Sequence, residues 1–85
     1  MKFLHYELKL VTYNKVRIDL NKQANALLLD NSNFQNYRNG MKYRYYGGHA
    51  TKTPVILSAP TSGEWHLVID SGGYTGTIKA SVSLI

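Results

Sequence analysis

The feature that most constrains the fold is an alternation of apolar and polar residues with a period of two. Residues 4–10, 16–20 and 78–84 show this alternation. It predicts strands with one buried face, because successive side chains of a β-strand point to opposite faces of the sheet. Two further runs, 26–29 and 65–69, are apolar on both faces, which is typical of central strands that are covered on both sides.

Segments 41–46 and 54–58 complete a set of about seven strands. No segment keeps a helical stripe for three turns, and the best helical candidate, 22–29, is short enough to be a strand. Residues typical of turns separate the strands, at Asp30-Asn31-Ser32-Asn33, Asn39-Gly40, Gly47-Gly48, Ala59-Pro60-Thr61-Ser62-Gly63 and Ser71-Gly72-Gly73. We therefore predict an all-β fold, an antiparallel, jelly-roll-like β-sandwich of seven to eight short strands, as a single domain over residues 1–85.

Composition narrows the class of protein further. The 85 residues include no cysteine, which excludes disulfides, thiolate metal sites and cysteine nucleophiles and suits a reducing compartment. His5, Glu7 and Lys9 interrupt the apolar start, so no signal peptide is predicted, and no stretch approaches the ~18 apolar residues of a membrane span. A cytoplasmic protein without membrane contact is expected.

The charge is unevenly distributed along the chain. Ten Lys and Arg residues against five Asp and Glu residues give a net charge of +5, and the span 31–63 contains no acidic residue. Within it, segment 36–49 interleaves four tyrosines with three fixed positive charges. Aromatic faces beside cations suit stacked, anionic ligands such as nucleotides. The candidate ligand- or partner-binding residues are Tyr37, Arg38, Lys42, Arg44, Tyr46, Gly47, Gly48 and His49.

In a strand over 41–46 the odd-numbered and even-numbered side chains would point to opposite faces. Met41, Tyr43 and Tyr45 would form the more apolar face, and Lys42, Arg44 and Tyr46 would form a basic face. Gly47-Gly48 would allow close approach of the backbone to a ligand. In the alternative interpretation the tyrosines belong to the margin of the core, and the cations only keep an exposed strand soluble.

Motifs for catalysis are missing from the sequence. The glycine-rich stretch 70–77 lacks the Lys-Ser/Thr and following helix of a phosphate-binding loop, so a hairpin turn is expected there. No nucleophile motif is present, and a small sandwich offers little room for a substrate cleft. We expect no enzymatic activity, no catalytic residues and no cofactor.

The histidines offer a weak metal-binding pattern. His5 and Glu7 would share one face of a strand, and Glu64 and His66 would do the same on another. If those strands were neighbours, the four side chains would converge as ligands for a divalent metal. Such pairs arise by chance in β proteins, so we predict no metal site and expect His66 to be half-buried and hydrogen-bonded.

Several motifs together resemble a small bacterial family. They are Met1-Lys2-Phe3-Leu4-His5-Tyr6-Glu7-Leu8, Asn21-Lys22-Gln23-Ala24-Asn25, Ser32-Asn33-Phe34-Gln35-Asn36-Tyr37-Arg38, Tyr45-Tyr46-Gly47-Gly48 and the stretch from Gly63 to Tyr74. They are similar to the domain-of-unknown-function family 1883. The resemblance implies an all-β sandwich that occurs alone or fused to TIR domains, and hence a sensing or binding role beside an effector. It implies no catalytic residues.

The sequence thus favours a non-catalytic binding or sensing module for an anionic or nucleotide-like ligand or a protein partner. The family resemblance implies that it acts with TIR-type bacterial signalling or defence proteins. Sequence-specific nucleic-acid binding is not expected, since no helix that could enter a major groove is predicted. The alternative is a structural or oligomerisation domain that pairs with a second copy through the Tyr-rich edge strand.

Overall fold

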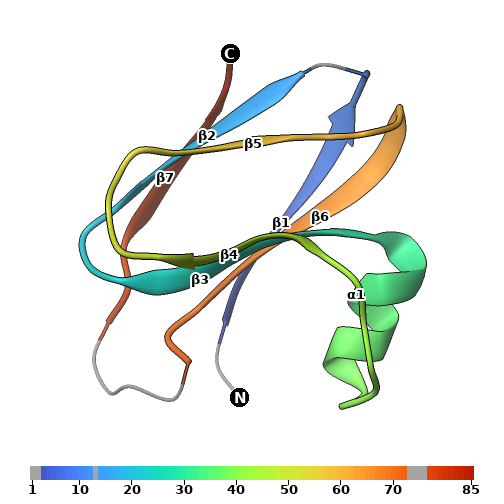
Figure 1. Cartoon of the computed structure of the whole chain (residues 1–85), viewed down its shortest axis with the longest axis horizontal. Helices are drawn as coiled ribbons and strands as arrows, with labels where there is room; N and C mark the ends of the chain where they lie inside the picture. The colour runs from blue at the N-terminus through green and yellow to red at the C-terminus, as the bar shows by residue number, and fades with distance from the viewer. Residues whose placement is uncertain (1–2, 13, 73–76) are drawn as a thin grey trace.

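Two antiparallel sheets and one helix make up the computed structural model, which describes residues 3–12, 14–72 and 77–85 (Figure 1). The elements are β1 (Phe3–Leu10), β2 (Lys15–Leu20), β3 (Ala24–Asp30), α1 (Asn31–Arg38), β4 (Tyr46–Ala50), β5 (Val55–Ser58), β6 (Gly63–Asp70) and β7 (Ala80–Leu84). The strand orders are β1-β6-β3-β4 in one sheet and β5-β2-β7 in the other. The predicted all-β sandwich is confirmed.

The predicted alternation builds the core between the two sheets. Leu10, Val16 and Ile18 are buried there, and Leu4, Tyr6, Leu8 and Leu20 pack against them. Leu84, predicted to lie on the buried face of its strand, is instead 51% exposed at the end of β7. The sequence pattern therefore identifies the inner faces correctly and fails only at the end of an edge strand.

The two apolar runs are the central strands β3 and β6 of the four-stranded sheet. Leu28 and Leu67 face the core between the sheets, whereas Leu29 and Val68 point to the outer face. Helix α1 lies against this outer face and buries Phe34 and Tyr37 there. These strands are apolar on both faces because the other sheet covers one face and the helix covers the other.

Helix α1 contradicts the prediction that Asp30 to Asn33 form a turn and that no helix is present. Asp30 is the N-cap, and its side chain accepts a hydrogen bond from the backbone N–H of Asn33 at 2.8 Å. The helix ends where Asn39 and Gly40 (φ +69°) turn the chain. Its eight residues make only about two turns, too few for the three-turn stripe that the sequence criterion required.

The prediction of a strand over 41–46 is also wrong, and so is the prediction of a turn at Gly47-Gly48. Residues 41–45 belong to no strand, and β4 begins only at Tyr46 and includes both glycines. Segment 41–45 runs back along α1, where the backbone N–H of Arg44 donates to Asn33 Oδ1 at 2.7 Å. The helix therefore takes the place of a neighbouring strand for this part of the chain.

The hairpin predicted after Asp70 does not form. Strand β6 lies in the four-stranded sheet and β7 in the three-stranded sheet, so the connection between them crosses from one sheet to the other. The loop begins with Ser71 and Gly72 (φ +66°), and its remaining glycines lie outside the described residues.

Candidate functional site

The outer face of the four-stranded sheet, beside α1, brings two histidines together. Strands β1 and β6 are paired so that Glu7 lies opposite His66, and His5 lies two residues before Glu7 on the same face. His5 Nε2 is 2.8 Å from His66 Nδ1. One donor atom from each of His5, Glu7 and His66 lies within 4.8 Å of the other two. The neighbouring strands on which the weak metal-binding pattern depended are therefore present.

Helix α1 covers this cluster with an aromatic ring. The ring of Phe34 stacks on both imidazoles, with centroid distances of 4.1 Å to His5 and 4.3 Å to His66. Burial by these neighbours lowers the pKa of His5, the adjacent His66 lowers it further, and Glu7 opposes the change. The arrangement favours a neutral imidazole at His5, which is the form that binds metals.

A shallow groove of about 300 Å³ lies next to the histidines. It is lined by Glu7, Leu8, Lys9, Asn31, Glu64, Trp65 and His66. Glu64 is paired with Lys9 across the strands and shares the groove without joining the three-residue cluster. Of the four residues in the predicted metal-binding pattern, His5, Glu7 and His66 thus form a compact group, and Glu64 lies beside it in the groove.

A second polar cluster surrounds the buried carboxylate of Asp70. Tyr37 donates its hydroxyl hydrogen to Asp70 Oδ2 at 2.7 Å, and the Asn25 side-chain amide and the Gly72 N–H donate to Oδ1 at 2.8 and 3.0 Å. Burial raises the pKa of Tyr37, and the hydrogen bond to Asp70 raises it further. Tyr37, which was predicted to stack on a ligand, is only 7% exposed and has a structural role instead.

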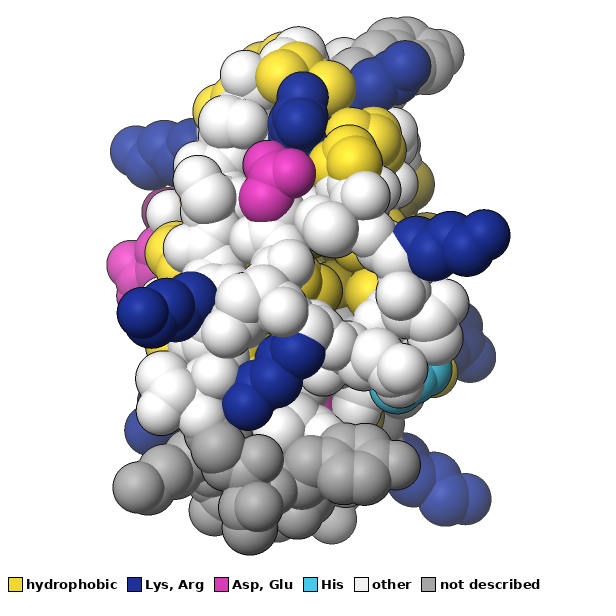
Figure 2. Space-filling view, turned by 90° about the vertical axis from the view of Figure 1, so that its left-hand side faces the viewer, with side chains coloured by type: hydrophobic (Ala, Val, Ile, Leu, Met, Phe, Trp, Pro, Cys, Tyr) yellow, Lys and Arg dark blue, Asp and Glu magenta, His cyan; other side chains and the backbone are white. Residues whose placement is uncertain are grey.

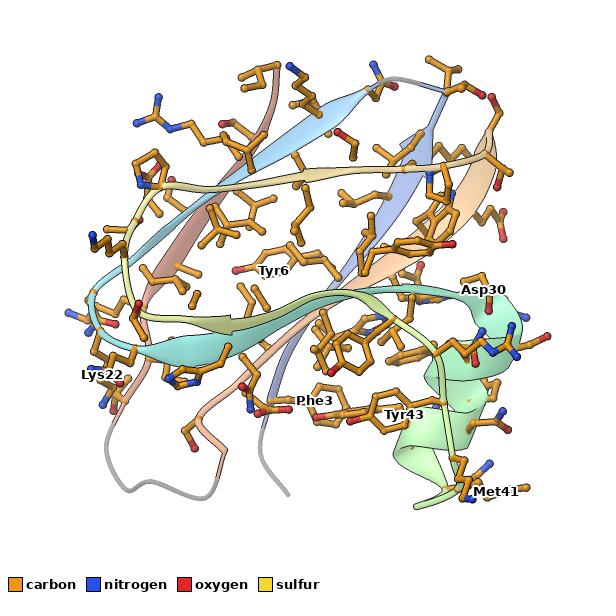
Figure 3. All side chains as sticks on the ribbon, in the orientation of Figure 1. Phe3, Tyr6, Lys22, Asp30, Met41 and Tyr43 are labelled. Atoms are coloured by element: carbon orange, nitrogen blue, oxygen red, sulfur yellow. The ribbon has the colours of Figure 1, made fainter. Side chains whose placement is uncertain are left out.

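The other tyrosines of the segment are divided between two places. Tyr43 packs edge-on against Tyr37 with centroids 5.2 Å apart, and Tyr45 follows at 5.7 Å from Tyr43. Figure 3 shows Tyr43 on the same side of the sheet as Phe3, next to α1. Tyr46 instead lies edge-on to Trp65 of the inner core. Tyr43 and Tyr45, which the alternative interpretation of the sequence placed at the margin of the core, are 36% and 47% exposed.

The three predicted cations, Arg38, Lys42 and Arg44, are all exposed. Arg38 lies over the Phe34 ring with Cζ 5.7 Å from its centroid, on the histidine cluster. Lys42 and Arg44 extend from the segment that follows the helix. Among the described residues, the one salt bridge joins Arg17 and Asp19, so neither Lys42 nor Arg44 is neutralised by a carboxylate there.

Gly47 and Gly48 differ in the space that a side chain would have at each position. A side chain at Gly47 would collide with the Ala26 carbonyl oxygen of β3, whereas Gly48 faces open space. Gly47 therefore allows close approach of the backbone to the neighbouring strand β3. This contact accounts for a glycine at position 47, and no ligand is needed to explain it. His49 is exposed, and its Nδ1 is 3.3 Å from Asn25 Oδ1, so it connects the end of β4 to the Asp70 cluster.

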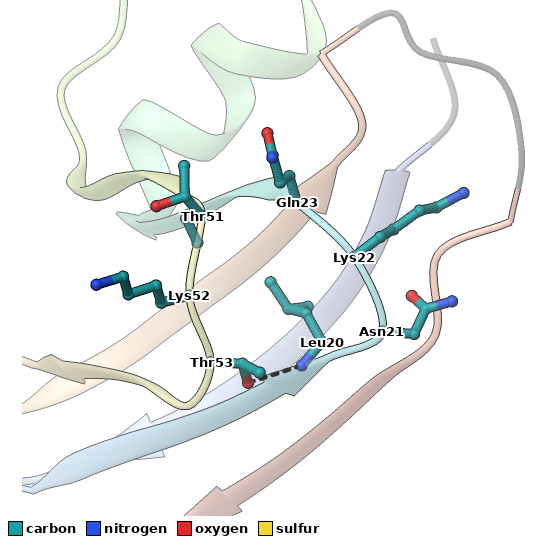
Figure 4. A pocket seen from close by; sticks show the side chains of 8 residues that line it. Leu20, Asn21, Lys22, Gln23, Thr51, Lys52 and Thr53 are labelled. Atoms are coloured by element: carbon teal, nitrogen blue, oxygen red, sulfur yellow. Dashed lines mark hydrogen bonds between the residues drawn. The ribbon is translucent and has the colours of Figure 1, made fainter.

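Two further hollows lie at the opposite end of the sandwich, beside the β4–β5 connection. One, of about 340 Å³, is formed by residues 20–23 and 50–53, and the other, of about 370 Å³, includes Gly47, Gly48 and His49. Figure 4 shows Lys22 and Lys52 pointing away from each other at the rim of the first. Figure 2 shows Lys and Arg side chains scattered over this end. A focused anion site is not formed here.

Sequence reasoning missed Phe34, Asn31 and Asp70 as parts of these clusters. A signal for Phe34 was present, since Phe34 and Tyr37 are three residues apart behind a capping Asp30. Asp70 carried no such signal, because its partners come from β3, α1 and the loop after β6.

The fold and these clusters define a small β-sandwich domain whose outer face is covered by one short helix. The family described as domain of unknown function DUF1883 matches residues 1–85, and the chain belongs to this family. The resemblance seen in the sequence motifs is thereby confirmed. Searches of the curated proteins and of the solved structures found no match.

No helix in the described part of the chain is long and apolar enough to cross a membrane.

Proposed function

We propose that this domain is a non-catalytic binding module that holds an anionic, nucleotide-like ligand on segment 42–46. The observation that carries the proposal is the exposure of Tyr43, Tyr45 and Tyr46 beside two cations, Lys42 and Arg44, that lack an acidic partner among the described residues. Tyrosine faces stack on bases, and Lys and Arg pair with phosphates. Tyr37, one of the candidate binding residues from the sequence, is not part of the proposed site because it is buried.

The segment is held in place before any ligand arrives. Its backbone is hydrogen-bonded to the helix through Asn33, and Tyr43 rests on the buried Tyr37. Fixing a binding segment in advance reduces the conformational entropy lost on binding. Because all five residues of segment 42–46 are exposed, the segment suits a ligand that lies along the surface rather than one enclosed in a cavity.

Replacing Lys42 and Arg44 together by alanine should weaken binding of ADP and of a short oligothymidylate at low salt. The loss should shrink as salt increases, because contacts with phosphate release counterions. A Tyr45→Ala variant should weaken oligothymidylate binding roughly tenfold, since stacking contributes about 1–3 kcal/mol per base. Binding is measured by NMR titration of the backbone amides.

The matched control is the Lys22→Ala/Lys52→Ala variant, which removes the same charge at the other end of the molecule. It should keep most of the affinity. Amide shifts of residues 42–46 that stay unchanged with both probes would contradict the proposal. An equal loss of affinity in the control would show that only net charge matters.

A second candidate function is self-assembly through β4. This strand is at the edge of the four-stranded sheet, and Tyr46 at its start is 49% exposed. Unpaired edge strands readily add a strand from another chain. Sedimentation velocity over a hundredfold range of concentration would show a growing dimer fraction, and a monomer at every concentration would contradict it. The link to TIR effectors, implied by the family resemblance, stays a prediction.

A further inference from the structure

We propose that His5, Glu7 and His66 form a binding site for one divalent transition-metal ion of the zinc type, on the outer face of the four-stranded sheet. The inference is independent of the anion-binding segment. It rests on the position of three donor atoms that the sheet and the helix hold together.

The sheet fixes the three residues relative to one another. Glu7 is directly opposite His66 in the β1–β6 register, and His5 is the next residue along β1 on the same face. All three therefore come from two hydrogen-bonded strands rather than from loops. Sites on such elements hold their geometry more precisely than sites on loops.

Hydrogen bonding sets the protonation of the rings. His66 Nε2 lies 3.3 Å from Asn31 Oδ1, an oxygen that only accepts hydrogen bonds. Nε2 therefore carries the hydrogen, and Nδ1 presents its lone pair to His5. An outer partner that holds a ring in this way is a usual feature of metal-binding histidines. Asn31 thus favours the tautomer of His66 in which Nδ1 is free of hydrogen and can act as a ligand.

A metal would replace the hydrogen bond between the two imidazoles. Two ligands in a tetrahedral zinc site, with bonds of about 2.0–2.1 Å, lie roughly 3.3 Å apart. The two imidazole nitrogens are 2.8 Å apart, so they must separate by about half an ångström. The rings must also rotate, because in the hydrogen bond the two nitrogens point at each other, whereas a metal needs both lone pairs to converge on one position. The hydrogen on His5 Nε2 would move to Nδ1 through solvent, without net release of a proton. Glu7 is exposed, and its carboxylate oxygen lies within 4.8 Å of a ring nitrogen of each histidine.

The chemistry of the ligands selects the metal. Two imidazoles and one carboxylate suit Zn²⁺, Co²⁺, Ni²⁺ or Cu²⁺, whereas Mg²⁺ and Ca²⁺ prefer oxygen ligands alone. Phe34 closes one side of the rings, and the groove that Glu7 and His66 share with Glu64 leaves the other side open. A fourth position would be filled by water or by a group of a ligand in the groove. The positive charge of Arg38, which lies over the Phe34 ring, would oppose the binding of a cation at this site.

The test is isothermal titration of the tag-free chain with Zn²⁺ at pH 7.5, together with visible absorption of its Co²⁺ complex. We expect one ion per chain and d–d bands typical of low coordination number. In NMR spectra of the imidazole nitrogens, His5 and His66 should shift and His49 should not. Mg²⁺ should produce none of these changes.

Variants decide whether the bound ion uses these residues. Glu7→Gln and His5→Ala, both at exposed positions that should leave the fold intact by circular dichroism, should weaken Zn²⁺ binding about tenfold or more. His49→Ala removes the third histidine, whose ring is hydrogen-bonded to Asn25 and which does not belong to the cluster. This variant should leave Zn²⁺ binding unchanged. Absence of saturable Zn²⁺ and Co²⁺ binding would overturn the proposal, as would binding that survives in both variants or is lost in His49→Ala.

Discussion

Replacing Gly47 with alanine should destabilise the domain by roughly 3–5 kcal/mol, enough to unfold much of it at moderate temperature. Gly47 has φ +114°, a conformation that side chains rarely adopt, and a Cβ there would collide with the carbonyl oxygen of Ala26 on β3. Since that oxygen belongs to the backbone of a central strand, β4 would have to move away from the sheet. A domain of this size has a total stability of about 4–13 kcal/mol.

Gly48→Ala is the matched control. Gly48 also has a positive φ (+143°), but nothing lies within 4 Å of the position of its Cβ. Only the backbone strain applies, so the cost should be about 1–2 kcal/mol. Urea unfolding followed by circular dichroism measures both. Equal losses in the two variants would show that the contact with Ala26 does not determine the packing of β4.

Replacing Tyr37 with phenylalanine should cost about 1.5–3 kcal/mol at pH 7, because hydrogen bonds to charged groups contribute this much. The variant removes the hydroxyl that donates to Asp70 and leaves the ring packed against Phe3 and Tyr43. The lost free energy of unfolding therefore measures the contribution of the hydrogen bond, because the substitution leaves no cavity in place of the ring. Thermal and urea unfolding at pH 7 give the difference in the free energy of unfolding.

The same variant should change the response to alkaline pH. The pKa of Tyr37 is raised in the folded state, so its contribution is fully present below the unfolded tyrosine pKa of about 10 and is lost as pH rises above that value. The wild-type chain should lose stability from pH 10 upward more steeply than Tyr37→Phe. Tyr45→Phe, at an exposed tyrosine, is the control and should follow the wild type. Parallel alkaline curves for all three proteins would contradict this assignment.

The strands show how much of the fold could be predicted. Alternation identified β1, β2 and β7, and the doubly apolar runs identified β3 and β6 as central, because burial on one or both faces directly sets which positions are apolar. The helix was missed because two turns give too short a periodic signal. Once α1 is present, segment 41–45 follows its surface instead of pairing in the sheet. Tyr43 and Tyr45 thereby become accessible while Tyr37 is buried.

The candidate sites depended on a different kind of information. The sequence placed His5 with Glu7, and His66 with Glu64, on shared faces, because that follows from the two-residue period. Whether the two strands were neighbours depended on strand order, and β1 pairs with β6 across about sixty residues of chain. The Asp70 cluster likewise combines groups from β3, α1 and β6 that no local pattern connects.

The amino-acid pattern was enough to establish the fold class, the inner faces of the strands, the lack of cysteine chemistry and the excess of positive charge in the middle of the chain. Which of these residues meet became known only from the three-dimensional fold. It placed Phe34 over the two histidines, buried Tyr37 against Asp70, and left Lys42 and Arg44 exposed beside three exposed tyrosines. The reason is that periodicity reports which face a side chain occupies, whereas contacts between distant strands depend on the order in which the chain pairs them.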